Sequence, residues 1–169
     1  MLIQPPKEQV SFRLIRDEDG PFLLELYAST REWEFANLAW DRPAFDDFVK
    51  RQFEAQSASY EMTYLGASFR IIQLGETDIG RLIADRQDDC LRIIDLTLAP
   101  AWQGRGIGTD ILRALMNEAH GGKVPVRLCA EKTNGRALHI YQKHGFMVTG
   151  ESPGHFDLEW RPHTGPREI

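Results

Sequence analysis

The fold is decided by one stretch, Leu96-Thr97-Leu98-Ala99-Pro100-Ala101-Trp102-Gln103-Gly104-Arg105-Gly106-Ile107-Gly108. Three glycines between a strand-like run and a helical run let the backbone pass close to a ligand. They also leave amide groups at the helix start pointing outward, where the positive end of the helix dipole favours a phosphate or pyrophosphate. Arg105 adds a cation and Gln103 a polar side chain at the rim. The stretch predicts a phosphate-binding loop, although the glycines alone would also suit a simple tight turn.

A second element downstream favours the ligand-binding interpretation. It reads Asn134-Gly135-Arg136-Ala137-Leu138-His139-Ile140-Tyr141-Gln142-Lys143-His144-Gly145-Phe146 and predicts a helix over Asn134–His144. Asn134 and Tyr141 are almost two helical turns apart, so both lie on one helix face. A polar pair at this distance from the glycine loop points to a shared site.

The segment from Asp95 to Phe146 resembles the acetyl-CoA-binding core of the GNAT superfamily of N-acetyltransferases. The resemblance implies that main-chain amides of the glycine loop hold the pyrophosphate of coenzyme A. It also implies that the end of the preceding strand pairs with the pantetheine arm like an added strand. The residues expected to contact acetyl-CoA are Leu96, Thr97, Leu98, Gln103, Gly104, Arg105, Gly106, Ile107, Gly108, Asn134, Ala137 and Tyr141.

The resemblance further implies direct transfer of an acetyl group from acetyl-CoA to an amine. The N–H of Leu98 is expected to polarise the thioester carbonyl, because a fixed backbone donor stabilises charge that develops on oxygen. Tyr141 is expected to act as general acid, since a tyrosine with an ordinary pKa of about 10 stays protonated at neutral pH. Neither a metal nor a covalent enzyme intermediate is required. The structural alternative for Tyr141 is packing of its ring beside Phe146.

The sequence indicates the general base, which would remove the proton of the amine, less clearly than the general acid. Many GNAT proteins place a glutamate on the strand before the glycine loop, but the comparable residue here is Arg92. Asp95 lies on the same strand and could simply pair with a neighbour. We predict Glu34 as the base, because it falls between the first two helices, where GNAT proteins often build the acceptor pocket. Aromatic residues expected either in that pocket or in the core are Trp33, Phe35, Trp40 and Tyr60.

The residues around this core predict the remaining elements. A strand is expected over Val10–Ile15 and a helix over Asp17–Ala28. Ser29-Thr30-Arg31-Glu32 matches a capping box that would start a new helical segment, with Glu32 as its acid. Asp41 and Pro43 start the next helix. Later strands are expected over Ser68–Leu74, Asp78–Asp85, Leu91–Leu98 and Val124–Ala130, and closing strands near Val148 and over Phe156–Trp160.

This order predicts an α+β fold with one domain over residues 1–169. Antiparallel hairpins come first, followed by strand–helix–strand–helix–strand, which gives a mixed, mostly antiparallel sheet flanked by helices. The helix with Ile111 and Leu115 on one face should make the Leu91–Leu98 and Val124–Ala130 strands parallel neighbours. The resemblance implies that these fourth and fifth strands splay apart to admit acetyl-CoA.

The composition argues against some classes of partner and favours a reducing compartment. The net charge of −5 argues against nucleic acid and anionic membranes, because phosphate binding needs a basic surface. No run of residues is apolar enough for a signal peptide or a membrane span. Cys90 and Cys129, the only cysteines, lie in strand-like runs, so both are expected to be buried and reduced. A cytoplasmic protein is the expectation, and the resemblance adds a possible homodimer.

Other functions fit the sequence less well. A P-loop would end in Gly-Lys-Ser/Thr, whereas Gly108-Thr109-Asp110 stands here. A dinucleotide fold would place its glycine loop after the first strand. His139 and His144 are not spaced as metal ligands on one helix face. The alternative that stays open is a non-catalytic sensor or interaction module that binds coenzyme A or acyl-CoA; the acceptor, a small molecule or peptide, is not identified by the sequence.

Overall fold

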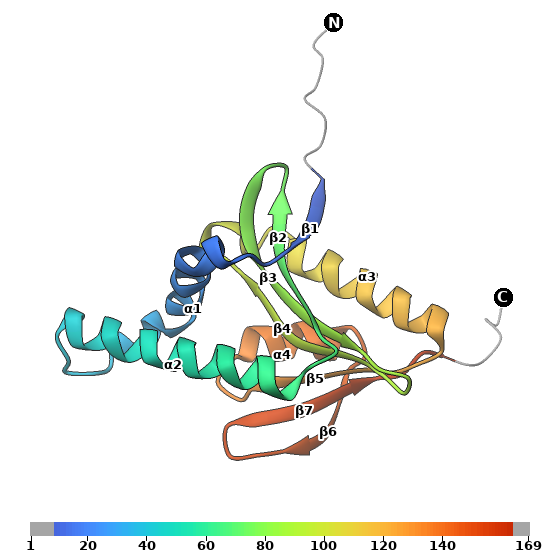
Figure 1. Ribbon diagram of the computed structural model, residues 1–169. Coiled ribbons are helices and arrows are strands. Elements are labelled where there is room, and N and C mark those ends of the chain that lie inside the picture. The colour runs from blue at the N-terminus through green and yellow to red at the C-terminus, as the bar shows by residue number, and fades with distance from the viewer. Residues whose placement is uncertain (1–8, 164–169) are drawn as a thin grey trace, which may run out of the picture. The chain divides into compact units, whose positions relative to one another are not determined.

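A computed structural model describes residues 9–163 of the chain. Figure 1 follows its elements in order. The strands are β1 Val10–Leu14, β2 Ser68–Leu74, β3 Thr77–Arg86, β4 Leu91–Leu98, β5 Val126–Glu131, β6 Met147–Glu151 and β7 His155–Trp160. The helices are α1 Gly20–Phe35, α2 Arg42–Thr63, α3 Ile107–Gly122 and α4 Gly135–Lys143, with short 3-10 turns at Asp17–Asp19 (η1) and Pro100–Trp102 (η2).

The strands form one seven-stranded sheet in the order β1-β2-β3-β4-β5-β7-β6. β1 pairs antiparallel with β2, and β7 pairs antiparallel with both β5 and β6. β4 and β5 are parallel, as the crossover through α3 requires. The mixed, mostly antiparallel sheet predicted from the sequence is therefore confirmed.

The chain divides into two compact units. The first comprises Met1–Leu65, Phe69–Leu82 and Thr97–Gly104, and the second comprises Gly66–Ser68, Ile83–Leu96 and Arg105–Ile169. In the first unit, α1 packs along α2 (Figure 1) and buries Tyr27 against Phe45 and Val49. Asp41 caps α2 by accepting a hydrogen bond from the amide of Ala44 at 2.8 Å, as its position before Pro43 predicts.

In the second unit, α3 packs on β5. Its buried side chains Ile111, Leu112, Leu115 and Ala119 recur at helical spacing and form one apolar face. The facing residues of β5 are Val126, Leu128 and Ala130, which alternate with outward-facing residues as a half-buried strand requires. This packing accounts for the crossover between β4 and β5.

Two local predictions are wrong. The segment Ser29–Glu32 does not start a helix but lies inside α1, where the hydroxyl of Ser29 donates to the carbonyl of Leu26. Glu32 pairs with Arg42 instead of capping a helix. Cys129 is exposed, whereas Cys90 is buried as expected. Cys129 alternates with Leu128 and Ala130 along β5, so its side chain leaves the sheet on the opposite face.

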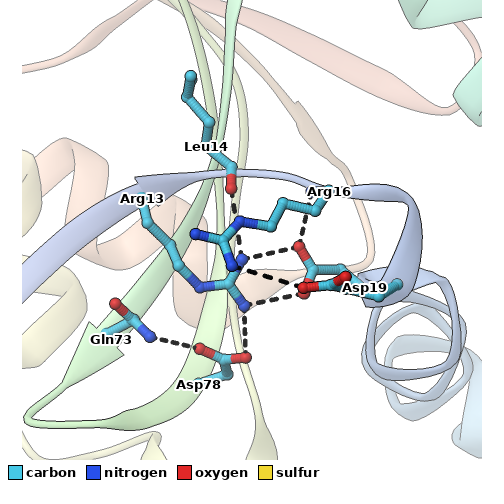
Figure 2. A network of polar contacts seen from close by, with 7 residues as sticks. Arg13, Leu14, Arg16, Asp19, Gln73 and Asp78 are labelled. Carbon is cyan, nitrogen blue, oxygen red and sulfur yellow. Dashed lines mark hydrogen bonds and ion pairs between the residues drawn. The ribbon is translucent and has the colours of Figure 1, made fainter.

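A network of charged groups ties the start of the chain to the β2–β3 hairpin (Figure 2). The guanidinium of Arg13 donates to both carboxylate oxygens of Asp19 at 2.8 Å and to Asp78 at 2.7 Å. Asp19 also accepts a hydrogen bond from the backbone N–H of Arg16, and Gln73 donates to Asp78. Asp19 is buried, so this network compensates for taking its charge out of water.

Candidate functional site: a glycine loop, a capped helix and a half-buried tyrosine

The glycine loop has the backbone geometry of an anion-binding turn. Gly104 and Gly106 adopt positive φ angles of 74° and 83°, a region that residues with a side chain enter only at a cost. Gly106 is the N-cap of α3 and has no side chain with which to cap it. A Cβ atom built on Gly106 would meet nothing within 4 Å. The first backbone N–H groups of α3 therefore point outward from an uncrowded helix start, which carries the positive end of the helix dipole.

The strand leading into this loop is held tightly in the first unit. The N–H of Ala99 donates to the carbonyl of Ile79 at 2.8 Å, and the side chain of Gln103 donates to the carbonyl of Leu98 at 2.9 Å. A Cβ atom on Gly80 would lie 2.3 Å from the carbonyl oxygen of Thr97 and 2.9 Å from a methyl carbon of Leu98. Only glycine at position 80 allows this approach of β3 to the end of β4.

Asn134 and Tyr141 both lie on the segment that follows β5, as predicted. Asn134 is the N-cap of α4, and its side-chain oxygen accepts a hydrogen bond from the amide of Ala137 at 3.1 Å. The capping role leaves its side-chain amide group available as a donor. Tyr141 lies in the last turns of α4, and its ring packs against that of Phe146 with centroids 5.6 Å apart. The packing contact considered for Tyr141 thus exists, and it orients the ring.

The environment of Tyr141 keeps its hydroxyl protonated. Burial and the nearby negative charge of Asp95 raise the pKa of Tyr141 to about 12. Both causes act in the same direction, because each disfavours the phenolate. A group in this state can donate a hydrogen bond or a proton at every physiological pH.

The pairing between β4 and β5 covers only part of both strands. Their parallel register comprises Leu91↔Val126, Arg92↔Arg127 and Ile93↔Leu128. β4 continues to Leu98 and β5 to Glu131. The register thus ends where the resemblance places the splay between these strands.

The predicted acceptor-side residues lie in the first unit. Glu34, in the last turn of α1, forms an ion pair with Arg31 at 3.0 Å. Of the aromatic residues, Phe35 packs on Phe45 and Trp40 packs edge-on against Phe48. Trp33 and Trp40 are 54% and 45% exposed, which is high for indole rings and leaves apolar surface around the connection between α1 and α2.

Sequence reasoning missed one polar pair in the second unit. The thiol of Cys129 donates to the carboxylate of Asp157 at 2.8 Å, across directly opposed positions of β5 and β7. Neither residue belongs to a motif. The signal that could have found the pair is the alternation of both strands, but it becomes useful only once the β5–β7 register is known.

Within residues 9–163, no group of three or more His, Cys, Asp or Glu side chains is arranged to hold a metal ion. No helix in that same range has the length and apolar character needed to cross a membrane.

The family model and the curated relative that this chain matches are both acetyltransferases. Residues 66–148 match the family model of the Acetyltransferase (GNAT) domain. N-alpha-acetyltransferase RimI of Mycobacterium tuberculosis is 31% identical over 105 residues, which cover 62% of this chain and 65% of RimI. The chain thus matches a little under two thirds of the length of this curated relative.

Solved structures share the fold over most of the chain. PaiA N-acetyltransferase of Thermoplasma acidophilum, solved with coenzyme A, gives a TM-score of 0.67 at 19% identity and covers 90% of this chain and 99% of its own. Naa50 of Arabidopsis thaliana, solved with the bisubstrate analogue CoA-Ac-MVNAL, gives 0.60 at 15% identity over 89% and 97%. These structures share their fold with this chain, in agreement with the resemblance that the residues of the glycine loop and α4 carry.

Proposed function

We propose that the chain is a single-domain N-acetyltransferase that transfers an acetyl group from acetyl-CoA to an amine. The observation that carries this proposal is the uncapped start of α3 behind two glycines of positive φ. This geometry suits a pyrophosphate, because free amides and the helix dipole both attract negative charge. The match of residues 66–148 to the family model of the Acetyltransferase (GNAT) domain supports the same activity.

The residues present fit the donor substrate. Gln103, Gly104, Arg105, Gly106, Ile107 and Gly108 would hold the pyrophosphate of acetyl-CoA, and Leu96, Thr97, Leu98, Asn134 and Ala137 would contact its pantetheine arm. The thioester supplies the activated acyl group. Space for a ligand at Gly106, where an added Cβ would touch nothing, supports this fit.

The chain's own groups then account for the transfer. The N–H of Leu98 would stabilise negative charge on the carbonyl oxygen while the amine attacks. Tyr141 would give a hydrogen bond or proton to the departing sulfur, since its pKa of about 12 keeps it protonated. Glu34 stays a prediction as the base; its ion pair with Arg31 would have to coexist with that role.

For the acceptor we propose a free α-amine of a peptide. RimI is named as an N-alpha-acetyltransferase, and the Naa50 ligand joins coenzyme A to the peptide MVNAL. The chemistry is also favourable, because an α-amine has a pKa of about 7.7–8.0 against about 10.4 for lysine. Near neutral pH, a far larger fraction of α-amines is unprotonated and able to attack. A cytoplasmic location and a homodimer stay predictions.

Binding and turnover test this function separately. Calorimetry should detect association of the purified chain with acetyl-CoA and with coenzyme A. Release of free thiol should then follow addition of the peptide Met-Val-Asn-Ala-Leu, with lysine peptides and polyamines run in parallel. Binding without turnover on any amine would favour a sensor module, and no binding at all would refute both functions.

Two glycine variants make the binding test specific. Gly106→Ala should weaken acetyl-CoA binding by about tenfold or more, because alanine resists the positive φ by roughly 1–2 kcal/mol and shifts the loop. Gly121→Ala, at the other end of the same helix, is the matched control. An added Cβ meets nothing within 4 Å at either position, so only the backbone angle separates the two variants.

A further inference from the structure

Arg92, Cys129 and Asp157 share one face of neighbouring strands in the second unit. Arg92 on β4 faces Arg127 of β5 in the parallel register, and Cys129 follows Arg127 on the same face. Asp157 on β7 lies directly opposite Cys129 and accepts the hydrogen bond of its thiol at 2.8 Å. The charge of Arg92 also reaches this thiol, because it acts on the pKa of Cys129.

This row lies at the point where β4 and β5 stop pairing. Their last register pair is Ile93↔Leu128, so Cys129 is the first residue of β5 beyond it. Under the proposed function the thioester enters between these strands, and the inference below rests on that function. Adjacent strands are about 4.8 Å apart, and the hydrogen bond to Cys129 directs the carboxylate of Asp157 back towards β5.

Among the carboxylates of the β6–β7 hairpin, which lies wholly within the described residues, that of Asp157 has no cationic partner. Glu151 pairs with Lys132 at 2.6 Å, and Glu159 pairs with Arg127 at 2.8 Å. Within residues 9–163, the carboxylate of Asp157 is engaged by the thiol of Cys129 and by no arginine, lysine or histidine. An exposed carboxylate in this state is suited to bind an ammonium group.

The carboxylate whose charge acts on Tyr141 lies on the other face of the sheet. Asp95, whose charge raises the pKa of Tyr141, follows Ile93 on the face that Leu128 shares, opposite to Cys129. Under the proposed function, Tyr141 would act from the side of Asp95, so that a hydrogen-bond donor for the sulfur and a proton acceptor for the nitrogen would approach the thioester from opposite sides.

We propose that Asp157, positioned by Cys129, binds the ammonium group of the acceptor and takes up its proton during transfer. The bound ammonium first releases one proton to water. The neutral amine then attacks, the bond between nitrogen and the acyl carbon forms, and the nitrogen loses a second proton to the Asp157 carboxylate. The bond between carbon and sulfur breaks, and the departing thiolate accepts a hydrogen bond from Tyr141 and then takes a proton from water. Exchange with water returns the Asp157 proton to solvent.

This step does not require a strong base. The attacking nitrogen becomes strongly acidic once it bonds to the acyl carbon, so a weak base can accept its proton. The other charged and titratable groups on this face are Arg92 of β4, Arg127 and Glu131 of β5, and His155 and Glu159 of β7, while β6 contributes Thr149 and Gly150. Arg127 is occupied by Glu159 and Asp89, so it does not neutralise Asp157.

The kinetic test compares carboxylates. Asp157→Asn should lower kcat/KM for the best amine of the acceptor panel by about 100-fold at pH 7, and the deficit should shrink towards pH 9 as solvent accepts the proton. Acetyl-CoA binding by calorimetry should match that of the unsubstituted chain. Glu151→Gln, which removes the same charge from the same hairpin, should leave kcat/KM unchanged.

Each outcome decides between specific alternatives. Full activity of Asp157→Asn together with a large loss in Glu34→Gln would overturn the proposal and assign the base to Glu34. Loss of acetyl-CoA binding in Asp157→Asn would also overturn it, because the carboxylate would then serve the donor or the fold. An unsubstituted chain that neither binds acetyl-CoA nor turns over would instead refute the proposed function itself.

Alkylation of Cys129 gives a readout that does not depend on turnover. Partial burial, the hydrogen bond to Asp157 and the charge of Asp157 raise the pKa of Cys129 to about 11. Asp157→Asn should therefore speed the reaction of Cys129 with iodoacetamide at pH 8.5, because more thiolate forms.

The acceptor peptide should slow this reaction in the unsubstituted chain. Cys129→Ser, which keeps a hydrogen-bond donor to Asp157, should retain most of the activity. No protection by the peptide would count against acceptor binding at this pair.

Discussion

Tyr141 illustrates how its surroundings set the reactivity of a single residue. Its pKa of about 12 exceeds the value of about 8.5 for an ordinary thiol by three to four units. Complete transfer of its proton to a free thiolate is therefore uphill, and under the proposed function its main contribution would be a hydrogen bond to sulfur as the negative charge develops. We therefore expect Tyr141 to raise kcat by a factor at the lower end of the range that is typical of general acids.

Tyr141→Phe tests this expectation. The variant should lose about 10- to 100-fold in kcat while its affinity for acetyl-CoA stays the same, because the ring and its contact with Phe146 remain. In the unsubstituted chain, ionisation of Tyr141 should not lower kcat below pH 10, since the hydroxyl loses its proton only as the pH approaches 12. Stopped-flow measurement of thiol release checks both points, and an unchanged kcat would remove Tyr141 from the chemistry.

Gly80 acts on the site through the backbone of its neighbour. In Gly80→Ala the new Cβ would stand 2.3 Å from the oxygen of Thr97, so the end of β4 must move. We expect kcat to fall by about 100-fold, the effect of a displacement on the order of 1 Å at a reacting group. Ile79→Val is the control, because it costs about 0.5–1.5 kcal/mol of stability in the same strand without pushing β4. Equal kcat losses in both variants would mean that destabilisation alone is responsible.

At the scale of elements, two kinds of contact hold the parts of each unit in place. Apolar faces pack α1 on α2 and α3 on β5. Charged groups fix the entry of the chain into α1, because Arg13 of β1 joins Asp19 of η1 to Asp78 of β3 (Figure 2). Removing one partner of such a buried network leaves the others desolvated and uncompensated, which makes it sensitive to substitution and to acid.

Asp19→Asn should expose this sensitivity. We expect a loss of about 3 kcal/mol in the free energy of unfolding, measured by urea denaturation at pH 7. The hydrogen bond from Arg13 holds the pKa of Asp19 below its ordinary value. Its stabilising contribution is present above the unfolded pKa of about 4 and is lost as the pH falls through the lower folded value. The variant should therefore lose less stability than the unsubstituted chain on acidification from pH 5 to pH 2. Parallel acid curves would contradict the assignment.

At the scale of the whole molecule, ligand binding should couple to stability. A ligand that binds only the folded chain at 100 times its Kd adds about 2.7 kcal/mol. For a chain of 169 residues, that corresponds to a rise of about 5–10 °C in Tm. Differential scanning fluorimetry with acetyl-CoA, and with acetate as the control, measures the shift. No rise at saturating acetyl-CoA would contradict binding to the native state.

Much of the fold could be predicted because the signals are local. β2 and β4 begin and end at the residues expected, and α2 begins after its Asp41 cap. The capping box failed for a reason that is also local: Ser29 and Thr30 can return their hydroxyls to carbonyls one turn back, so the same residues fit the interior of α1. Cys129 was placed wrongly because an apolar neighbourhood in sequence does not say which face of a strand is covered.

The sequence by itself indicated which family this chain resembles, because its glycine loop and the helix of Asn134 and Tyr141 are short segments whose backbone requirements can be recognised from their own residues. Only the tertiary structure decided which side chains meet across strands. The pairing of Cys129 with Asp157 and the approach of Gly80 to Thr97 depend on strand order and register, and a slip of one residue would reverse every side chain to the other face of the sheet.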